Sequence, residues 1–309
     1  MKAKLLDYLI CPTCLPVEIG LECLDSRTQG SDITAGRLRC SGCRRDYFIE
    51  NGIAHLLPER KVVDENRYER QQALDSYLWS HYADLLDDPD AGNAYHLWAG
   101  LLPSDVGLSL DIGCAVGRFT FEMAARSAMA IGIDSSAPFI REARRLFKEH
   151  RHDFLLPLEG AISEQKSFGL PEAWQDLNIE FLVADALALP FRNNTFNSIS
   201  SLNILDKVPH PLVHLRQADR VAADRNATFL ISDPFSWSEE VANPQEWLGG
   251  HTRGPFAGRG IDNLRSLVEG ADEVIVPWRI DRCDSVWWKI RNHANHFELI
   301  RSEYLVAVR

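Results

Sequence analysis

The sequence predicts an α/β fold in which a doubly wound, mostly parallel sheet follows a small cysteine-rich module. Apolar strand segments alternate with amphipathic helical segments from about residue 105 onward, three successive strands end in Asp111, Asp134 and Asp185, and two CxxC pairs lie near the N-terminus. Parallel strands align their carboxyl ends along one edge of a sheet, where ligands bind. The three acids are therefore expected to face one ligand site.

Composition limits the class of partner. The 309 residues are 45% hydrophobic and 25% charged, ordinary globular values, and the chain is long enough for two domains. A net charge of -11 argues against a sequence-independent grip on nucleic acid, which depends on Lys and Arg neutralising phosphates. No apolar run approaches the roughly 20 residues of a membrane span, and the N-terminus does not resemble a signal peptide. We expect a cytoplasmic protein with no membrane contact.

Four of the seven cysteines form two pairs, Cys11 with Cys14 and Cys40 with Cys43. Two CxxC pairs can bring four thiolates to one point, the closed tetrahedral arrangement of a structural zinc site. A redox CxxC is the alternative, but it needs only one pair. The pattern predicts a structural zinc ion, Zn2+, within residues 1–58.

The second pair is followed by RDYFIENGIAHLLP, an alternating apolar pattern interrupted by Asn51 and Gly52. This pattern predicts a β-hairpin with a tight turn, and hence a zinc ribbon. LLDYLICPTC and YFIENGIAHLLPE resemble the Trm112-like family of zinc ribbons. The resemblance implies a module that holds or activates methyltransferases acting on RNA and protein, here fused to its enzyme.

Residues 59–104 are polar at first and then aromatic. Helical spacing puts six side chains near one face, namely Leu74, Tyr77, Leu78, His81, Tyr82 and Leu85. We expect a linker and one or two helices, with most of the aromatic residues in the core. Helices before the first motif cover the cofactor in many methyltransferases, so Tyr77 and Tyr82 are candidate lid residues.

The stretch Ser109–Ala124 (SLDIGCAVGRFTFEMA) predicts a strand ending at Asp111, a turn with Gly113 and Gly117, and a helix from about Arg118. Its DxGxxxG spacing is neither a dinucleotide GxGxxG nor a P-loop. The stretch resembles the first motif of class I S-adenosylmethionine (SAM) methyltransferases. The resemblance implies that Asp111 and the backbone of Gly113, Cys114 and Gly117 receive the amino acid end of SAM.

The next two strands end in acids with their own expected roles. The strand Met129–Ile133 ends at Asp134, which with Ser135 is expected to bind the ribose hydroxyls, and Ser136 is expected to cap the following helix. The resemblance implies that Asp185 or its neighbour Ala186 contacts the adenine of SAM. Together these motifs imply a Rossmann-like, seven-stranded class I methyltransferase fold over residues 105–309.

The remaining segments complete the expected fold. Residues 150–178 are expected to form a long irregular connection, which is usually functional. A fourth strand leads to Asn203, and a fifth covers residues 227–232. A sixth strand is expected near residues 274–280, and the last, at the C-terminus, is expected to be the antiparallel edge strand.

Residues after the fourth and fifth strands are candidates for acceptor chemistry. We predict catalytic roles for Asn203, Asp206 and Tyr82, with Asn203 also near the cofactor, because nitrogen acceptors can need a base or a carbonyl that holds the attacking lone pair. A second set has structural explanations that are equally good or better, and it comprises His210, Asp233, Trp237 and Trp247.

The segment from about residue 105 to 250 resembles the mercaptohistidine N-methyltransferase domain of ovothiol biosynthesis. The matching positions are Asn203, Asp206, Pro209, Trp237, Glu239, Glu240, Trp247, Leu248 and Gly249. The chain lacks the sulfoxide-synthase region of those proteins and has the ribbon instead. The resemblance favours a small-molecule acceptor, an imidazole or another small polar amine or thiol.

Two alternatives remain open from the sequence. A zinc ribbon joined to this fold also occurs in rRNA guanine-N1 enzymes, so an rRNA or tRNA base methyltransferase with an RNA-binding ribbon is the main rival. The other is a non-catalytic SAM-domain scaffold, which the intact acidic and glycine motifs disfavour. The oligomeric state is left open.

Overall fold

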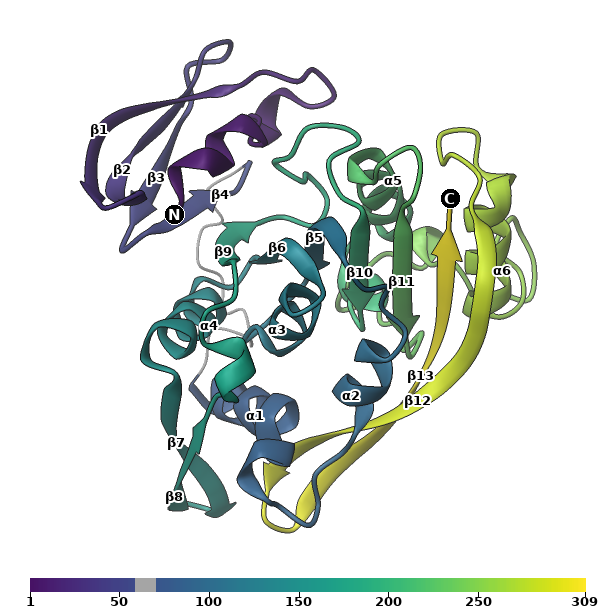
Figure 1. Cartoon of the computed structure of the whole chain (residues 1–309). Helices are drawn as coiled ribbons and strands as arrows, with labels where there is room; N and C mark the ends of the chain where they lie inside the picture. Colours follow the sequence, from purple (N-terminus) through teal and green to yellow (C-terminus); the bar gives the residue numbers. More distant parts are fainter. Residues whose placement is uncertain (59–70) are drawn as a thin grey trace.

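The computed structural model describes residues 1–58 and 71–309 (Figure 1). The polar part of the expected linker, residues 59–70, lies outside the described residues. In the described part of the chain, an eleven-stranded sheet has the order β1-β2-β3-β4-β9-β6-β5-β10-β11-β13-β12, and β7 and β8 form a separate hairpin. The strands are β1 Leu21–Gln29, β2 Asp32–Cys40, β3 Asp46–Glu50, β4 Ile53–Leu56, β5 Val106–Ile112, β6 Ser127–Asp134, β7 Arg151–Glu159, β8 Ile162–Gly169, β9 Ile179–Ala184, β10 Ser198–Leu202, β11 Thr228–Asp233, β12 Arg279–His293 and β13 His296–Val308.

Helices cover both faces of the sheet. The α-helices are α1 Gln71–Tyr82, α2 Ala94–Ala99, α3 Arg118–Ala124, α4 Ala137–Glu149, α5 Pro211–Val221 and α6 Gly260–Ser266, joined by short 3-10 turns and one π turn, Leu267–Ala271. One buried cluster includes residues of α1 to α4, and the other includes residues of α5, α6 and the N-terminal module. Each face of the central strands therefore has its own core, as parallel sheets require. No helix among the described residues is long and apolar enough to cross a membrane.

Seven strands, β9-β6-β5-β10-β11-β13-β12, form the predicted doubly wound sheet, so the predicted fold class is confirmed. Two details were wrong. The C-terminal strand β13 is antiparallel, as expected, but it lies between β11 and β12, and β12 is the edge strand. The expected strand near residues 274–280 is mostly loop, because buried Ile275 and Trp278 anchor it and Asp219 accepts the Val276 N–H and the Trp278 indole N–H.

The connection 150–178 is not irregular, contrary to the prediction. Most of it forms the hairpin β7–β8, which turns at Gly160, where φ is +55°. His152, Phe154 and Leu156 are buried on one face and alternate with exposed residues. Such alternation with a period of two is typical of a half-buried strand. The hairpin was not evident from the sequence because its second strand, β8, is mostly polar.

The cysteine-rich module is built onto the sheet. The predicted hairpin β3–β4 turns at Asn51 and Gly52, which have φ values of 51° and 77°, and β4 then pairs in parallel with β9. The amide of Ile10 also donates to the carbonyl of Pro190 at 2.9 Å. The hairpin β1–β2, which fills the segment between the two cysteine pairs, was not predicted.

The predicted helices around the first motif are confirmed. α3 begins at Arg118, and Ser136 caps α4 by accepting a hydrogen bond from the amide of Phe139 at 3.4 Å. In Figure 1 the long hairpin β12–β13 extends from the sheet past α2 toward α1. The side chain of Ser80 in α1 donates to the carbonyl of Lys289 in β12 at 2.7 Å. The C-terminal hairpin and the helices before the first motif thus form one wall.

Candidate functional site

One cavity lies at the carboxyl ends of β5, β6, β9 and β10, and about 250 Å³ of it is accessible to water-sized molecules. Its lining residues fall into two groups. The first follows the central strands and includes Asp111, Gly113, Cys114, Asp134, Ser135, Asp185 and Ala186. The second comes from α1, α2, the segment after β10, and β12, and includes Tyr77, His81, Tyr95, Asn203, Lys207 and Trp288. We call these groups the strand end and the helix end of the cavity.

The turn after β5 is shaped by backbone that only glycine adopts easily. Gly113 has a φ of 77°, and a Cβ there would lie 2.4 Å from Ile204. Gly117 has a φ of 86°, but it does not line the cavity, and a Cβ there would lie 2.8 Å from the Phe181 ring. Gly113 therefore lets the backbone reach the cavity floor, whereas Gly117 allows the start of α3 to pack against β9.

Asp111 is 2% exposed, and two hydroxyls hold its carboxylate. Thr120 Oγ1 donates to Oδ2 at 2.7 Å, and Ser200 Oγ donates to Oδ1 at 2.8 Å. Burial raises the pKa of Asp111 to about 6, although these two hydrogen bonds oppose the shift. Asp111 therefore changes charge at a pH well above that of an exposed aspartate.

Backbone amides hold the other two acids. Asp134 Oδ2 accepts the Ala115 N–H at 3.0 Å, and Oδ1 accepts the Ser136 N–H at 2.8 Å. Asp185 Oδ1 accepts the Leu187 N–H at 2.9 Å. A carboxylate oxygen has two lone pairs, so the Asp185 carboxylate keeps capacity for ligand donors. The strand end is a rigid set of three acids.

The helix end depends on contacts between distant segments. The Trp288 indole N–H donates to Ser302 Oγ at 3.0 Å, and Ser302 donates in turn to Asn203 Oδ1 at 2.6 Å. Since an indole N–H can only donate, the Ser302 hydroxyl hydrogen is directed to Asn203. This relay engages the carbonyl oxygen of Asn203 and leaves its amide N–H groups available to the cavity.

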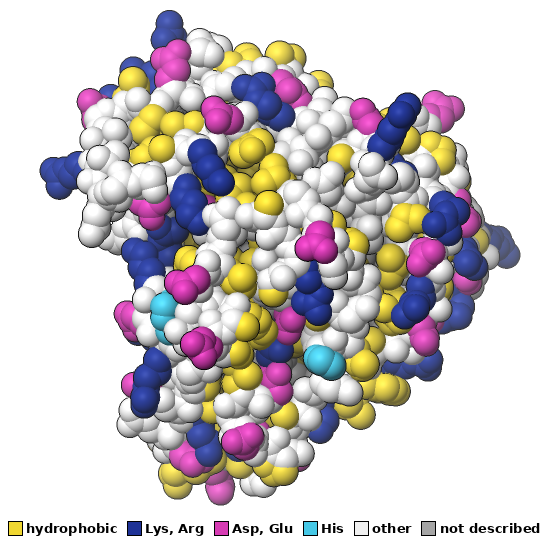
Figure 2. Space-filling view, in the orientation of Figure 1, with side chains coloured by type: hydrophobic (Ala, Val, Ile, Leu, Met, Phe, Trp, Pro, Cys, Tyr) yellow, Lys and Arg dark blue, Asp and Glu magenta, His cyan; other side chains and the backbone are white. Residues whose placement is uncertain are grey.

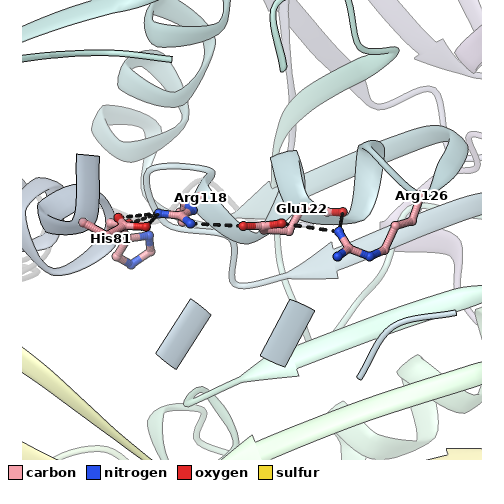
Figure 3. Close-up of polar contacts among 5 residues, drawn as sticks. His81, Arg118, Glu122 and Arg126 are labelled. Atoms are coloured by element: carbon pink, nitrogen blue, oxygen red, sulfur yellow. Dashed lines mark hydrogen bonds and ion pairs between the residues drawn. The ribbon is translucent and has the colours of Figure 1, made fainter. Parts of the chain in front are cut away.

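Arg118 links α1, at the helix end, to α3, the helix that follows the glycine turn of the strand end. Its guanidinium donates to the His81 carbonyl at 3.0 Å, to Asp84 at 2.7 Å and to Glu122 at 3.0 Å. Glu122 also contacts Arg126 at 3.4 Å, and Figure 3 shows these charged groups in a row with the His81 ring pointing away from it. Arg118 is 3% exposed, so this clamp is shielded from water.

Several sequence-predicted residues do not line the cavity. Tyr82 is fully buried, and its hydroxyl donates to the Val116 carbonyl at 2.9 Å. Asp206 is 1% exposed and accepts from Lys207 at 2.9 Å and from the Ser236 amide at 2.8 Å. Tyr82 therefore packs in the core, and Asp206 supports the loop after β11 through the Ser236 amide. Neither side chain lines the cavity. Their predicted catalytic roles remain predictions.

The second set of acceptor candidates is also outside the cavity lining. His210 is exposed, and its Nδ1 lies 3.2 Å from the Glu246 carboxylate. Asp233 is fully buried, and its burial next to Asp206 raises its pKa well above the usual range. Trp237 and Trp247 stack on each other with ring centroids 6.4 Å apart. Their structural explanations therefore agree with the geometry.

The four paired cysteines form one cluster. The Cys11 and Cys43 Sγ atoms are 3.7 Å apart, as are those of Cys14 and Cys40, and all four lie within 4.8 Å of one another. Four sulfurs at about 2.3 Å from a tetrahedral zinc ion would be roughly 3.8 Å apart. The cluster fits such an ion.

Comparison with known proteins decides the class of the domain. Residues 110–225, which include the turn after β5 and all three acids, match the family model described as a methyltransferase domain. This segment is a methyltransferase domain. The match extends from Leu110 in β5 to beyond the end of α5, so the domain includes the cavity floor. The search of curated proteins found no match.

Solved structures of methyltransferases resemble the chain at low identity. A SAM-dependent methyltransferase from Methanosarcina mazei is 18% identical over 68% of this chain and 95% of that chain, with a TM-score of 0.44. One from Aquifex aeolicus is 15% identical over 77% and 99%, with a TM-score of 0.43. A chain in the complex between the Haloferax volcanii Trm112 methyltransferase activator and a methyltransferase is 13% identical over 79% and 98%, with a TM-score of 0.46.

Sequence reasoning missed the residues of this methyltransferase domain that act through tertiary contacts. Trp288 and Ser302 lie on β12 and β13, far in sequence from the motifs, and no local pattern marks them. His214 in α5 is fully buried, with Nε2 2.8 Å from Ser201 Oγ and Nδ1 3.4 Å from the Ala186 carbonyl. It supports the loop after β9. Its position in an amphipathic helix gave no sign of this role.

Proposed function

We propose that this methyltransferase domain transfers the methyl group of SAM to a small-molecule acceptor, a ring nitrogen of an imidazole or thiol-histidine type. The observation that carries the proposal is the division of one cavity into an acidic strand end and an aromatic helix end. SAM has an ammonium group at its amino acid end and a ribose with two hydroxyls, and both of these suit acids. A flat acceptor suits aromatic walls.

The strand end supplies the cofactor contacts in this proposal. Asp111 attracts the SAM ammonium group, with the backbone of Gly113 and Cys114 beside it. Asp134 and Ser135 accept hydrogen bonds from the ribose hydroxyls, and Asp185 and Ala186 contact the adenine. Asn203 lies on the side of the reacting methyl group. Gly117 acts indirectly in this scheme, because its role is to let α3 begin close to β9.

A small acceptor is favoured over RNA for two reasons. Residues of α1, α2 and β12 wall the helix end, and about 250 Å³ of the whole cavity is accessible to water-sized molecules, a volume that suits a small acceptor. On the face seen in Figure 2, Lys and Arg side chains are interspersed with Asp and Glu. Such a surface offers no continuous track for a phosphate backbone, in keeping with the net charge of -11.

We also propose that the cysteine cluster holds a structural zinc ion. The four sulfurs would occupy all tetrahedral positions, so none would remain for a substrate. The module pairs with the methyltransferase sheet at Leu56 and Ala184, and Ala184 directly precedes Asp185. In this scheme the zinc-held ribbon stabilises the end of the strand that leads to the adenine contact.

The methyl acceptor can be tested by incubating the purified protein with methyl-labelled SAM and either a small-metabolite extract rich in histidine-derived thiols and amines, or total RNA. The proposal expects label in the small-molecule fraction and much less label with the Asp134→Ala variant at the same SAM concentration. Label in RNA would overturn the acceptor assignment and revive the base-methyltransferase alternative. SAM binding without transfer to either fraction would favour the scaffold alternative.

The metal assignment has a separate test. Cys40→Ser should lower bound zinc, measured by elemental analysis, and reduce the melting temperature, because metal binding in such modules contributes directly to folding. Cys23→Ser is the matched control, since Cys23 lies on β1 outside the cluster. Retention of one zinc ion per chain in Cys40→Ser would contradict the four-thiolate site.

A further inference from the structure

His81 lines the cavity and has a buried ring nitrogen that lacks a hydrogen-bond partner among the described residues. It is 5% exposed, and its Nδ1 is buried with no hydrogen-bond partner among the described residues. No other described residue that lines the cavity has a buried side-chain nitrogen or oxygen in this condition. A buried polar group without a partner is unfavourable, and such groups are rare in native proteins. A ligand in the cavity could provide the missing partner.

Neighbouring contacts fix the position of this imidazole. The centroid of its ring is 4.6 Å from that of Tyr95 and 5.6 Å from that of Tyr77, and both tyrosines line the cavity. The His81 carbonyl accepts a hydrogen bond from the clamped Arg118. The imidazole is therefore held by packing against two aromatic rings and by its backbone, which is the preorganisation that a recognition group needs.

Its environment keeps the imidazole uncharged. Burial, with a further contribution from the nearby Arg118 charge, lowers the pKa of His81 to about 3. A neutral imidazole has one donor and one acceptor nitrogen. It can pair with a neutral N–H or with a ring nitrogen, but it offers no charge to hold an anion and does not readily take a proton from an alkylammonium group.

We propose that His81 contacts the methyl acceptor, through a hydrogen bond to an uncharged planar heteroaromatic ring that carries both a ring nitrogen and an N–H. This inference rests on the proposed function and narrows its substrate class. Aromatic residues around the cavity, Tyr77, Tyr95 and Trp288, provide flat apolar surfaces for such a ring. Asn203 offers amide N–H groups from the neighbouring wall.

The chemistry of transfer agrees with an uncharged ring. The lone pair of the acceptor nitrogen forms the new N–C bond while the C–S bond of SAM breaks, and the sulfur keeps the bonding electrons. The ring becomes a methylated cation, and its N–H proton passes to solvent after release. A heteroaromatic nitrogen has this lone pair at neutral pH, whereas an alkylamine must first lose a proton, for which His81 is too weak a base.

The test measures binding rather than turnover. Full-length protein saturated with S-adenosylhomocysteine, the demethylated product of SAM, is titrated with imidazole or ethylamine at a slightly alkaline pH and followed by ligand-detected NMR. We expect the wild type to bind imidazole and not ethylamine. His81→Phe should weaken imidazole binding about tenfold or more, with unchanged affinity for S-adenosylhomocysteine and no loss of melting temperature.

Two further variants separate recognition from folding. His81→Gln keeps a donor and an acceptor and should retain part of the imidazole affinity. His152→Phe is the matched control, because His152 is also buried but is hydrogen-bonded to Arg145 at 2.7 Å and lies outside the cavity lining. The His152→Phe variant should have a lower melting temperature than the wild type and an unchanged affinity for imidazole.

Imidazole binding that is equal in wild type and His81→Phe would overturn the inference, as would binding of ethylamine at least as tight as that of imidazole. Absence of imidazole binding to wild type would also overturn it. Failure of the proposed function would appear differently, as an absence of label transfer to small molecules in the SAM assay.

Discussion

The two ends of the cavity differ in how completely they are built. At the strand end, both carboxylate oxygens of Asp111 and of Asp134 already accept hydrogen bonds from the protein. At the helix end, His81 has a buried nitrogen without a partner among the described residues. The side chains of the strand end are thus already held by the protein, whereas the helix end keeps one unsatisfied group. Under the proposed function, this difference means that the fold builds the cofactor contacts in advance and leaves acceptor specificity to the second wall.

Removing the connection between the two ends should have the largest effect. Arg118→Ala would leave the buried Glu122 carboxylate without one of its two arginine partners and would free the His81 carbonyl. We expect a loss of about 3–5 kcal/mol in the free energy of unfolding, measured by urea denaturation. Arg126→Ala is the control, since its side chain is 30% exposed, and it should cost about 1 kcal/mol or less. Equal losses in the two variants would contradict the clamp.

Removing an acid of the strand end should affect the cofactor specifically. Asp134→Ala should weaken SAM binding by about 1–3 kcal/mol, measured by calorimetry, because under the proposed function the ribose hydroxyls lose a carboxylate acceptor. Asp206→Asn is the comparison, since Asp206 lies outside the cavity lining. It should change the stability of the loop after β10 and leave SAM affinity unaltered. A loss of SAM affinity in Asp206→Asn but not in Asp134→Ala would contradict the assignment of the cofactor contact to Asp134.

The pKa of Asp111 predicts a pH dependence with opposite signs for binding and folding. SAM binding needs the ionised carboxylate, so affinity should fall about tenfold per pH unit as pH drops below about 6. Folding behaves otherwise, because the pKa is raised above the unfolded value of 3.8. The contribution of this carboxyl to stability is present below that value and is lost as pH rises through about 6.

Calorimetry with SAM and denaturation across this pH range would measure both trends. Asp111→Asn should remove the pH dependence of each, with weaker SAM binding throughout. A pH-independent affinity for SAM in the wild type would mean that Asp111 does not face the ammonium group.

Loosening the helix end should give the smallest effect and should leave the cofactor untouched. Ser302→Ala breaks the relay from Trp288 to Asn203, at a cost of about 0.5–1.5 kcal/mol. We expect a higher KM for the acceptor with unchanged SAM affinity. Ser285→Ala, which removes an exposed hydroxyl on β12 that contacts Arg301, is the control and should change neither. A changed SAM affinity in Ser302→Ala would show that the two ends are not separable.

The sequence predicted the strand end well because its signals are local. Asp111 with its glycine turn, and Asp134 with the Ser136 cap, each lie within one strand–loop–helix segment whose pattern is visible in a few residues. The parallel order of the strands then brings the acids together. The cysteine cluster was predictable for the same reason, since each CxxC pair is local and a four-thiolate metal site would require the two pairs to meet.

The helix end could not be predicted because tertiary packing creates it. His81 shares a helix face with Tyr77 and Tyr82, and the sequence could not say which of these aromatic residues faces the cavity. Tyr77 and His81 line it, whereas Tyr82 packs in the core. Trp288 and Ser302 become part of the helix end only because β12 and β13 form a long hairpin that reaches α1. No spacing rule connects these strands to Asn203.

A crystal structure of the full-length protein with S-adenosylhomocysteine would test the account most directly. We predict the ribose against Asp134, the adenine beside Asp185, and the thioether sulfur directed toward the wall formed by His81, Asn203 and Trp288. A sulfur directed instead to the rim near Pro209, away from that wall, would contradict the assignment of the helix end to the methyl acceptor.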